Sequence, residues 1–292
     1  MKKLNLLWAV FLLLTACGKD EEPLPTGIIS TVERINGETT FVQASFADGS
    51  RLYFELLSDA TAAVVSVNAY YNGTVPPVSY CPENAVIPSV LAHNGKTYTV
   101  VGIGTEAFHL CYDLITVKLP NTVSYVGSNA FRGCTHLESL NFTEELTRIG
   151  NGAFQDCAFT SVELDEAITC IPPMAFAFCD HLLSVTLPHI DTIREDGFLN
   201  CTQLSSVELP ATTKALYTGA FGGCESLKTV VCRAVNPPAM LVPTYNSHPA
   251  TSPFFATPIE EIRVPEGSVE AYKAAPGWDS YADKIIGITS KH

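Results

Sequence analysis

The sequence predicts a solenoid, a coil of stacked repeats in which short strands form a parallel β ladder and irregular or short-helical segments return the chain. An apolar ladder recurs along the chain, as in Leu114, Val117 and Leu119. Because one repeat cannot cover its own apolar face, neighbouring repeats must stack, and six of them at about 4.8 Å would give a ladder roughly 25–30 Å long. Ahead of each ladder a phenylalanine recurs every 22 or 23 residues with a cysteine three positions later, at Phe108/Cys111, Phe131/Cys134, Phe154/Cys157, Phe176/Cys179, Phe198/Cys201 and Phe221/Cys224.

The motif itself resembles a known family. The run Gly-Ser-Asn-Ala-Phe-Arg-Gly-Cys-Thr-His-Leu-Glu-Ser-Leu, at 127–140, resembles the leucine-rich repeats of the BspA type, found in surface proteins of Bacteroidetes, treponemes and other microbes. The resemblance covers about residues 100–232, and segments near 86–98 and 262–278 are similar to the entry and closing segments of that family. It implies a leucine-rich-repeat solenoid and a role in adhesion to host matrix proteins or other cells, although many family members have no known ligand.

The N-terminus has the pattern of an export signal. Lys2 and Lys3 precede the apolar run 4–14, and Leu14-Thr15-Ala16-Cys17 resembles the bacterial lipobox, which implies that Cys17 is lipidated and anchors the protein to a membrane. The acidic segment that follows is similar to the export tag of Bacteroidetes lipoproteins, which implies an outer-membrane lipoprotein exposed at the cell surface. An ordinary cleaved signal and a plain solvated linker are the alternatives.

Six segments are expected. They are a lipoprotein signal peptide at 1–16, an acidic tether at 17–23, an N-terminal β cap at 24–99, six leucine-rich repeats at 100–232, a Pro-rich loop at 233–258, and a degenerate repeat with a C-terminal cap at 259–292. Turn signals at Asp48-Gly49, Asn72-Gly73 and Asn94-Gly95 predict hairpins in the N-terminal cap. In the C-terminal cap we expect Phe255 at the repeat's phenylalanine position, and a short helix beginning at Ser268 and ending before Pro276.

The six repeat cysteines are expected to stack in a buried column. Free cysteine is among the most buried residue types, so the main interpretation is a column of small hydrophobic side chains. Disulfides between neighbours in the column are a second interpretation, because an exported protein folds in an oxidising compartment. A zinc site is a third, with no CxxC motif to support it. Cys232 takes a strand core position, whereas no role is predicted for Cys81 and Cys170.

Composition and motifs argue against several functions. The net charge of −13 becomes about −15 once the two lysines of residues 1–16 are removed, so nucleic acid is not an expected partner. The chain has no Gly-x-Ser-x-Gly, HExxH or phosphate-cradling glycine motif, and His136 and His181 are expected to be solvated. We therefore expect no catalytic activity, no metal and no cofactor, and a monomer.

The outward face of the strands is the candidate site. Residues beside the inward ladder should point to solvent and form regular polar columns, which can bind an extended protein or glycan through many weak hydrogen bonds. The competing interpretation is that these small polar residues bond only to each other across strands. The candidate ligand-binding residues are Thr116, Lys118, Ser139, Asn141, Ser161, Glu163, Ser184, Thr186, Ser206 and Glu208, with Thr229 and Val231 continuing the two columns.

The function expected from the sequence is binding of a host or microbial extracellular protein, through this face or the Pro-rich loop. The alternative is a glycan-binding accessory lipoprotein of a polysaccharide-uptake system. Glycan sites usually present exposed aromatic rings, and the candidates here are few, namely Tyr112, Tyr217 and Tyr245.

Overall fold

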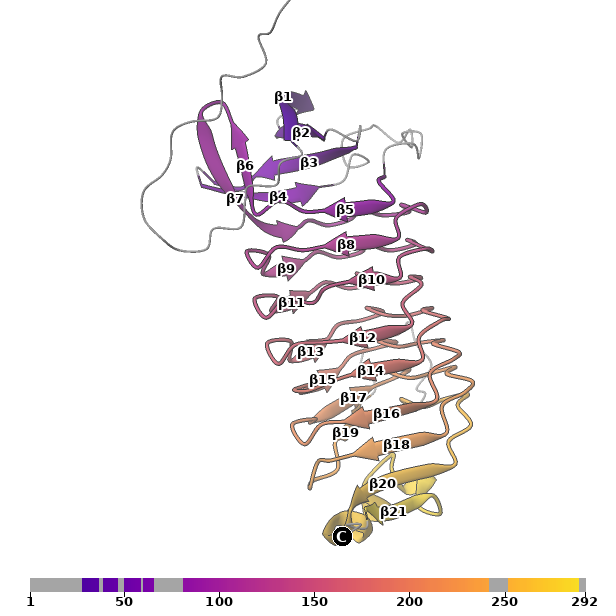
Figure 1. Ribbon diagram of the computed structural model, residues 1–292. Helices are drawn as coiled ribbons and strands as arrows, with labels where there is room; N and C mark the ends of the chain where they lie inside the picture. Colours follow the sequence, from indigo (N-terminus) through magenta and orange to yellow (C-terminus); the bar gives the residue numbers. More distant parts are fainter. Residues whose placement is uncertain are drawn as a thin grey trace, which may run out of the picture.

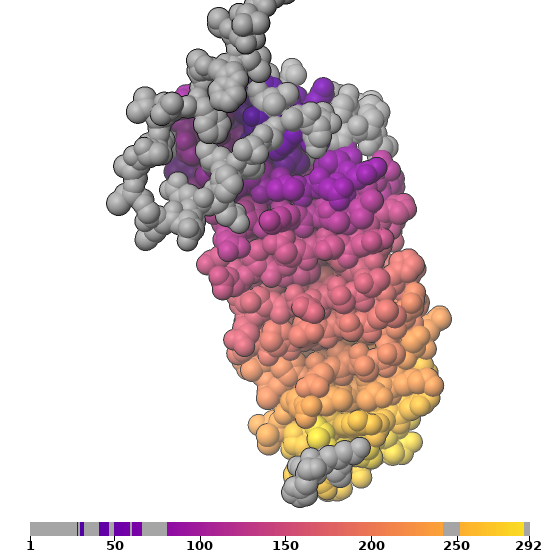
Figure 2. Space-filling view, in the orientation of Figure 1, coloured from indigo at the N-terminus to yellow at the C-terminus, as the bar shows by residue number. Residues whose placement is uncertain are grey.

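The computed structural model describes residues 28–36, 39–46, 50–58, 60–65, 81–241 and 252–288. It is an elongated parallel β-solenoid in which successive repeats stack in sequence order along one axis (Figures 1 and 2). The predicted fold class is confirmed. The predicted signal peptide and tether, the Asp48-Gly49 and Asn72-Gly73 turns, and residues 242–251 of the Pro-rich loop lie outside the described residues. No helix in the described part of the chain is long and apolar enough to cross a bilayer.

Each repeat contributes a strand to the first of two parallel ladders. The apolar positions of this first ladder point inward, with Leu114, Val117 and Leu119 all buried in the first repeat. Its strands are β5 (Asn84–Val86), β8 (Thr116–Lys118), β10 (Ser139–Leu140), β12 (Ser161–Glu163), β14 (Ser184–Thr186), β16 (Ser206–Leu209), β18 (Thr229–Cys232), β20 (Glu261–Pro265) and β21 (Ile285–Ile288).

A second ladder, which the sequence did not predict, runs beside the first. Its short strands are easy to miss in the sequence because most of them present one inward apolar residue each, such as Val126 or Ile193. It comprises β7 (Lys96–Ile103), β9 (Tyr125–Val126), β11 (Arg148–Ile149), β13 (Cys170–Ile171), β15 (Thr192–Ile193), β17 (Ala215–Tyr217) and β19 (Ala239–Leu241).

Irregular turns, not helices, carry the phenylalanine and cysteine of each repeat. Backbone hydrogen bonds here alternate between the same repeat and the next, as when Phe131 N–H donates to the carbonyl of Ala153 and Arg132 N–H donates to that of Asn129. The residues two before and two after each repeat phenylalanine have positive φ, for example Asn129 at 54° and Gly133 at 74°. Gly, Asn and Asp occupy most of these positions because they adopt this conformation at the lowest cost.

The phenylalanines form one continuous aromatic stack at the centre of the coil. Neighbouring rings lie 5.1–5.7 Å apart with interplanar angles of 3–14°, in the offset geometry that aromatic rings prefer. Every ring is buried, so each repeat covers the apolar face of the one before it. The stacked rings are Phe108, Phe131, Phe154, Phe176, Phe198, Phe221 and Phe254.

The C-terminal end of this stack corrects the sequence prediction by one residue. Phe254, not Phe255, stacks on Phe221, and Trp278 closes the stack at 6.2 Å from Phe254. Phe255 instead lies over Gly222, where a Cβ atom would stand 2.2 Å from the Phe255 ring. The prediction missed by one residue because the two adjacent phenylalanines are equally apolar. Only Gly222, which lies opposite Phe255, distinguishes their positions.

The rest of the C-terminal cap follows the expected pattern, with two additional strands. The predicted short helix is α1 (Val269–Ala274), and its Tyr272 is buried and donates a hydrogen bond to the carbonyl of Ala234 at 2.8 Å. Trp278 donates to the carbonyl of Pro238 at 2.7 Å. The structure differs from the expected loop at 233–258, because β19 lies within it and pairs with β17, and β21 extends the first ladder beyond β20.

The N-terminal cap is a β sheet that runs directly into the second ladder. Antiparallel strands β1 (Ile28–Asn36), β2 (Thr39–Phe46), β3 (Arg51–Leu56) and β4 (Thr61–Val65) lead to β7, which pairs in parallel with both β4 and β9. The predicted hairpin at Asn94-Gly95 joins β6 (Val90–His93) to β7, and both turn residues have positive φ, at 50° and 72°. Two positive φ values match the tight two-residue turn that this dipeptide favours.

One disulfide corrects the interpretation of the cysteines. Cys111, the first member of the repeat column, is bonded to Cys81, whose Cα lies 5.6 Å away just before β5. The other five column cysteines are free and buried, as expected. The bond arises because Cys111 has no preceding repeat beside it, so a cysteine from the N-terminal segment takes that neighbouring position.

Both ladders are interrupted between the second and third repeats. Strand pairing stops after β10 and β11 and resumes at β12 and β13, and the first ladder is interrupted again between β14 and β16. Next to the first interruption, at the end of β10, the Asn141 amide hydrogen-bonds the backbone of Leu119 in the preceding repeat at 2.7 and 2.9 Å, and the large ring of Phe142 takes a position held by leucine in other repeats. The backbone bonds of the phenylalanine turns continue across this gap, so the coil remains a single stack.

Candidate functional site: the exposed face of the first ladder

The outward side of the first ladder, from β8 to β18, is called here the first-ladder face. Strand register aligns the predicted hydroxyl column, with Ser139 opposite Thr116, Ser161 opposite Ser184, and Ser206 opposite Thr229. The predicted inward residues between them are buried, except Val185, which is half-buried, so the alternation predicted from the sequence is confirmed. A regular polar surface of small side chains therefore runs along the coil.

Most hydroxyl groups of the column have no partner among the described residues. Among the described residues, only Thr116 makes a side-chain hydrogen bond, donating to Asn84 Oδ1 at 2.6 Å. The hydroxyls of Ser139, Ser161, Ser184 and Ser206 are exposed and bond to no other side chain in the described part of the protein. This arrangement does not match the interpretation in which the column is held together by hydroxyl bonds across strands.

Two of the ten candidate residues are already engaged within the protein. Asn141 uses both its amide oxygen and its amide nitrogen on the backbone of Leu119. Glu208 accepts two hydrogen bonds from Arg233, at 2.9 and 3.3 Å. Thr116 is partly engaged through Asn84, which leaves seven candidates without a described side-chain partner: Lys118, Ser139, Ser161, Glu163, Ser184, Thr186 and Ser206.

One residue of this face was missed by the sequence reasoning. Leu183 precedes β14 and its side chain is 53% exposed, whereas the adjacent Leu182 is fully buried. The Leu183 N–H donates to the carbonyl of Thr160, which places the two residues side by side in neighbouring repeats. The Leu182-Leu183 doublet was the available signal, since only one of two consecutive leucines can point into the coil.

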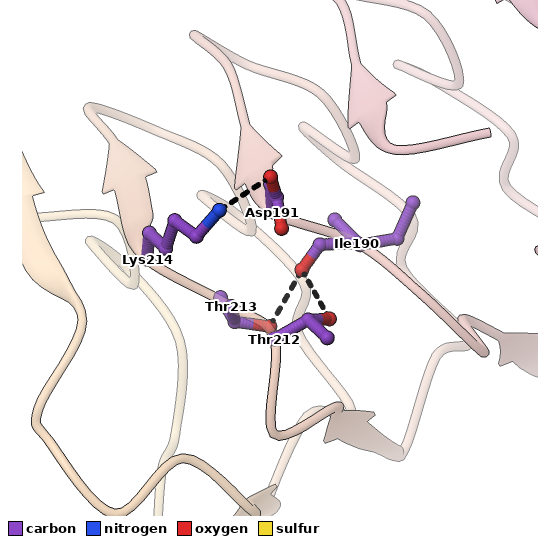
Figure 3. Close-up of polar contacts among 5 residues, drawn as sticks. All are labelled: Ile190, Asp191, Thr212, Thr213 and Lys214. Atoms are coloured by element: carbon purple, nitrogen blue, oxygen red, sulfur yellow. Dashed lines mark hydrogen bonds and ion pairs between the residues drawn. The ribbon is translucent and has the colours of Figure 1, made fainter.

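Several outward side chains of the second ladder make polar contacts with one another. Arg194 bonds the buried carboxylate of Glu195 at 3.2 Å, and its guanidinium lies 4.4 Å from the centre of the Tyr217 ring. Hydrogen bonding to Glu195 raises the pKa of Arg194, which therefore remains charged. Figure 3 shows Lys214 reaching Asp191 of the previous repeat at 2.7 Å.

Threonines fix the turn that enters the second ladder. Thr212 and Thr213 both donate to the carbonyl of Ile190, at 3.3 and 3.0 Å (Figure 3). Four repeats earlier along the coil, Thr122 makes the same kind of bond to the carbonyl of Val100. These hydroxyls satisfy backbone groups between repeats, and the hydroxyl column of the first-ladder face makes no such bonds.

The remaining sequence candidates do not converge. His136 and His181 are both exposed, and His136 contacts the Tyr112 carbonyl at 2.7 Å. Within the described ranges no three His, Cys, Asp or Glu side chains gather as a metal site would require. Of the three tyrosines considered for glycan stacking, Tyr245 lies outside the described residues, Tyr112 is exposed beside the first ladder, and Tyr217 lies under Arg194 on the second.

These features define a repeat scaffold with an exposed polar strand face. Residues 101–228 match the family model described as BspA type leucine rich repeat region, in six copies, so the predicted repeats and their family resemblance are confirmed over that segment. No curated protein matches the chain.

Three solved structures are similar to this chain. A leucine rich cell surface protein from Faecalibacterium prausnitzii is 21% identical with a TM-score of 0.48, and the match covers 82% of this chain and 72% of that one. A leucine-rich repeat protein from Bacteroides ovatus is 20% identical with a TM-score of 0.44, covering 75% and 70%. The leucine rich repeat protein of T. pallidum is 24% identical with a TM-score of 0.47, covering 62% and 80%.

Proposed function

We propose that this protein is a non-catalytic binding module, displayed at the bacterial cell surface, that captures a host or microbial extracellular protein through the first-ladder face. The observation that carries the proposal is the register-aligned column of exposed hydroxyls on that face, because none of Ser139, Ser161, Ser184 and Ser206 has a side-chain partner among the described residues. Donors and acceptors repeating at each strand suit an extended partner that bonds several repeats at once.

The rigidity of the scaffold supports this role. The strands under the face rest on buried inward residues and on the phenylalanine stack, so the outward side chains start from fixed positions. A preorganised surface loses less conformational entropy when it binds, and many individually weak hydrogen bonds can then give a useful affinity.

Protein is favoured over glycan as the ligand. Sugar rings are usually stacked on exposed aromatic side chains, and the outward strand positions of the first-ladder face from β8 to β18 carry polar, charged and aliphatic side chains and no aromatic ring. Tyr112 and Tyr217 belong to different repeats and to different sides of the coil, so they do not form a common stacking platform.

Surface display is proposed from the sequence. The run Leu14-Thr15-Ala16-Cys17 after an apolar segment supports lipidation at Cys17 and anchoring of the protein in the outer membrane. Metabolic labelling with a radioactive fatty acid should mark the wild-type protein and not the Cys17→Ser variant. External protease should degrade the wild-type protein on intact cells, and protection from protease would argue for the inner leaflet.

The binding proposal is tested by blocking the face with lysines. The variant Ser161→Lys, Glu163→Lys, Ser184→Lys and Thr186→Lys should fold normally and lose capture of immobilised extracellular proteins and of whole cells. A matched control carries the same change in charge at exposed positions away from the face, namely Glu166→Lys, Thr169→Lys, Ala211→Lys and Ala239→Lys. Unchanged capture by the first variant, or equal loss in both, would remove the first-ladder face as the binding site. Binding only on a glycan array would favour the uptake-system alternative.

A further inference from the structure

An exposed leucine lies in the middle of the first-ladder face. Leu183 has Thr160 beside it in the previous repeat and Ser205 at the same position in the next, and both of these neighbours are exposed polar residues. The leucine therefore has no apolar cover from the residues on either side of it in the column. Protein interfaces have an apolar centre and a polar rim, so an exposed leucine with polar neighbours offers one apolar contact to a partner.

The charges along the outward side of the first ladder, from Glu83 just before β5 to the end of β20, are divided unevenly. Towards the C-terminal end, from β16 to β20, three carboxylates are paired: Glu208 with Arg233, Glu260 with Lys228, and Glu261 with Arg263. Towards the N-terminal end, from Glu83 to β12, the carboxylates of Glu83, Glu138 and Glu163 have no ion-pair partner in the described ranges, and Lys118 is the single described base on the outward side of these strands. The N-terminal part is therefore negative, and the C-terminal part is neutral.

We propose that the N-terminal half of the first-ladder face, from Glu138 to Leu183, binds a basic, extended protein segment that places an apolar side chain on Leu183. This inference rests on the proposed function and names the chemistry of the partner. Lysine or arginine side chains of the partner pair with Glu138 and Glu163, and its backbone meets the hydroxyls of Ser139, Ser161 and Ser184. An anionic glycan or an acidic segment would be repelled by the same carboxylates.

The spacing of these groups sets the pattern of the partner. Glu138 and Leu183 hold equivalent positions two repeats apart, and the stacked rings beneath them are separated by 5.5 and 5.3 Å. A span of roughly 10 Å corresponds to about three residues of a chain in the extended polyproline II conformation, which rises about 3.1 Å per residue and returns a side chain to the same face every three residues. A basic residue three positions from an apolar one therefore fits the face when the partner chain crosses the strands.

The test uses the detergent-solubilised full-length protein and synthetic peptides of about twelve residues. The main probe is a serine peptide with two Lys-Ser-Ser-Leu units. One comparison peptide has serine for each leucine, another has glutamate for each lysine, and heparin serves as an anionic polysaccharide. The Lys-Ser-Ser-Leu peptide should bind, should weaken as salt is added, and should bind more tightly than all three other probes.

Variants of the protein separate local recognition from overall charge. Glu138→Gln with Glu163→Gln should weaken binding of the main probe about fivefold to tenfold, because two partly exposed charge pairs are lost. The control Glu208→Gln with Glu261→Gln makes the same change in charge nearer the C-terminal end of the same ladder and should stay within about twofold of wild type. Leu183→Asn should weaken the main probe about fivefold and abolish the difference between the leucine and serine peptides.

Each other outcome overturns the inference. Equal weakening by both glutamine pairs would show attraction to net charge alone, and tighter binding of the glutamate peptide or heparin would reverse the assigned chemistry. Self-association lost in Leu183→Asn, without peptide binding, would assign the face to a second copy of this chain. If the lysine-blocked variant loses protein capture while the Glu138→Gln, Glu163→Gln variant captures normally, the proposed function stands and this inference fails.

Discussion

The thiol of Cys157 donates a hydrogen bond to the backbone carbonyl of Phe131, 3.2 Å away in the preceding repeat. The same bond joins each free cysteine of the column to the phenylalanine one repeat earlier, at 3.0–3.3 Å. Cysteine is small enough for the buried turn and also supplies a weak donor, which alanine lacks. The column therefore links the repeats as well as filling space.

Replacing one column thiol should have a modest and local cost. Cys157→Ala removes the bond to Phe131 and a buried sulfur atom, so we expect a loss of about 1–2 kcal/mol in the free energy of unfolding. Urea denaturation followed by circular dichroism measures it. Cys170→Ala, at an exposed cysteine on β13, is the control and should change stability by less than about 0.5 kcal/mol. Equal effects of the two substitutions would argue against a structural role for the column.

The column thiols should also be chemically silent in the folded protein. Burial raises the pKa of Cys134 and of Cys179 to about 12 and that of Cys157 well above its usual value, so thiolate is scarce at pH 8. We expect a thiol reagent to label Cys170 alone in the native state and all seven free cysteines of the described chain in denaturant without reductant. Mass spectrometry of the labelled peptides would identify the sites. Rapid native labelling of Cys157 would contradict the packed column.

The same burial predicts a pH dependence of stability. A thiol whose folded pKa lies above its unfolded value of 9.0 adds stability that is fully present below pH 9 and is lost as the pH rises towards the folded pKa. For Cys134 and Cys179 this window is pH 9 to about 12, so the urea midpoint should fall between pH 9 and 11. The Cys134→Ala, Cys179→Ala variant should show a shallower fall. An identical slope in both proteins would assign the pH dependence to other groups.

The aromatic stack makes a positional prediction. Phe154 is fully buried with a ring stacked on each side, so Phe154→Ala should cost about 3–5 kcal/mol. Phe255 is only partly buried at the last repeat, so Phe255→Ala should cost about 1 kcal/mol. Thermal and urea unfolding measure both. Equal losses would argue that the rings do not act as a stacked array.

The sequence was sufficient for repeating features that several apolar residues mark in each repeat, and insufficient for features that are weakly marked or occur once. The periodic phenylalanines and inward apolar residues predicted the solenoid, the first ladder and the hydroxyl column, because each is specified six times. The second ladder was missed since most of its strands show a single apolar residue, as at Val126. Asn141 was taken as a ligand-facing residue, and nothing in the sequence indicated that its amide bonds the backbone of Leu119. The exposure of Leu183 depends on which of two adjacent leucines points outward, and the packing of the folded coil decides this.

The Cys81–Cys111 disulfide gives the last prediction, because it fastens the segment before β5 to the first repeat. It closes a loop with a sequence separation of 30 residues, for which chain-entropy arguments give a stabilisation of about 3–4 kcal/mol. Cys81→Ser with Cys111→Ser should therefore lower stability mainly at this end of the coil. Hydrogen exchange should speed up in β5 and β8, which follow Cys81 and Cys111 in the sequence and pair with each other. It should stay unchanged in β16 and β18 near the other end. Uniformly faster exchange along the chain would show instead that the whole solenoid unfolds as one unit.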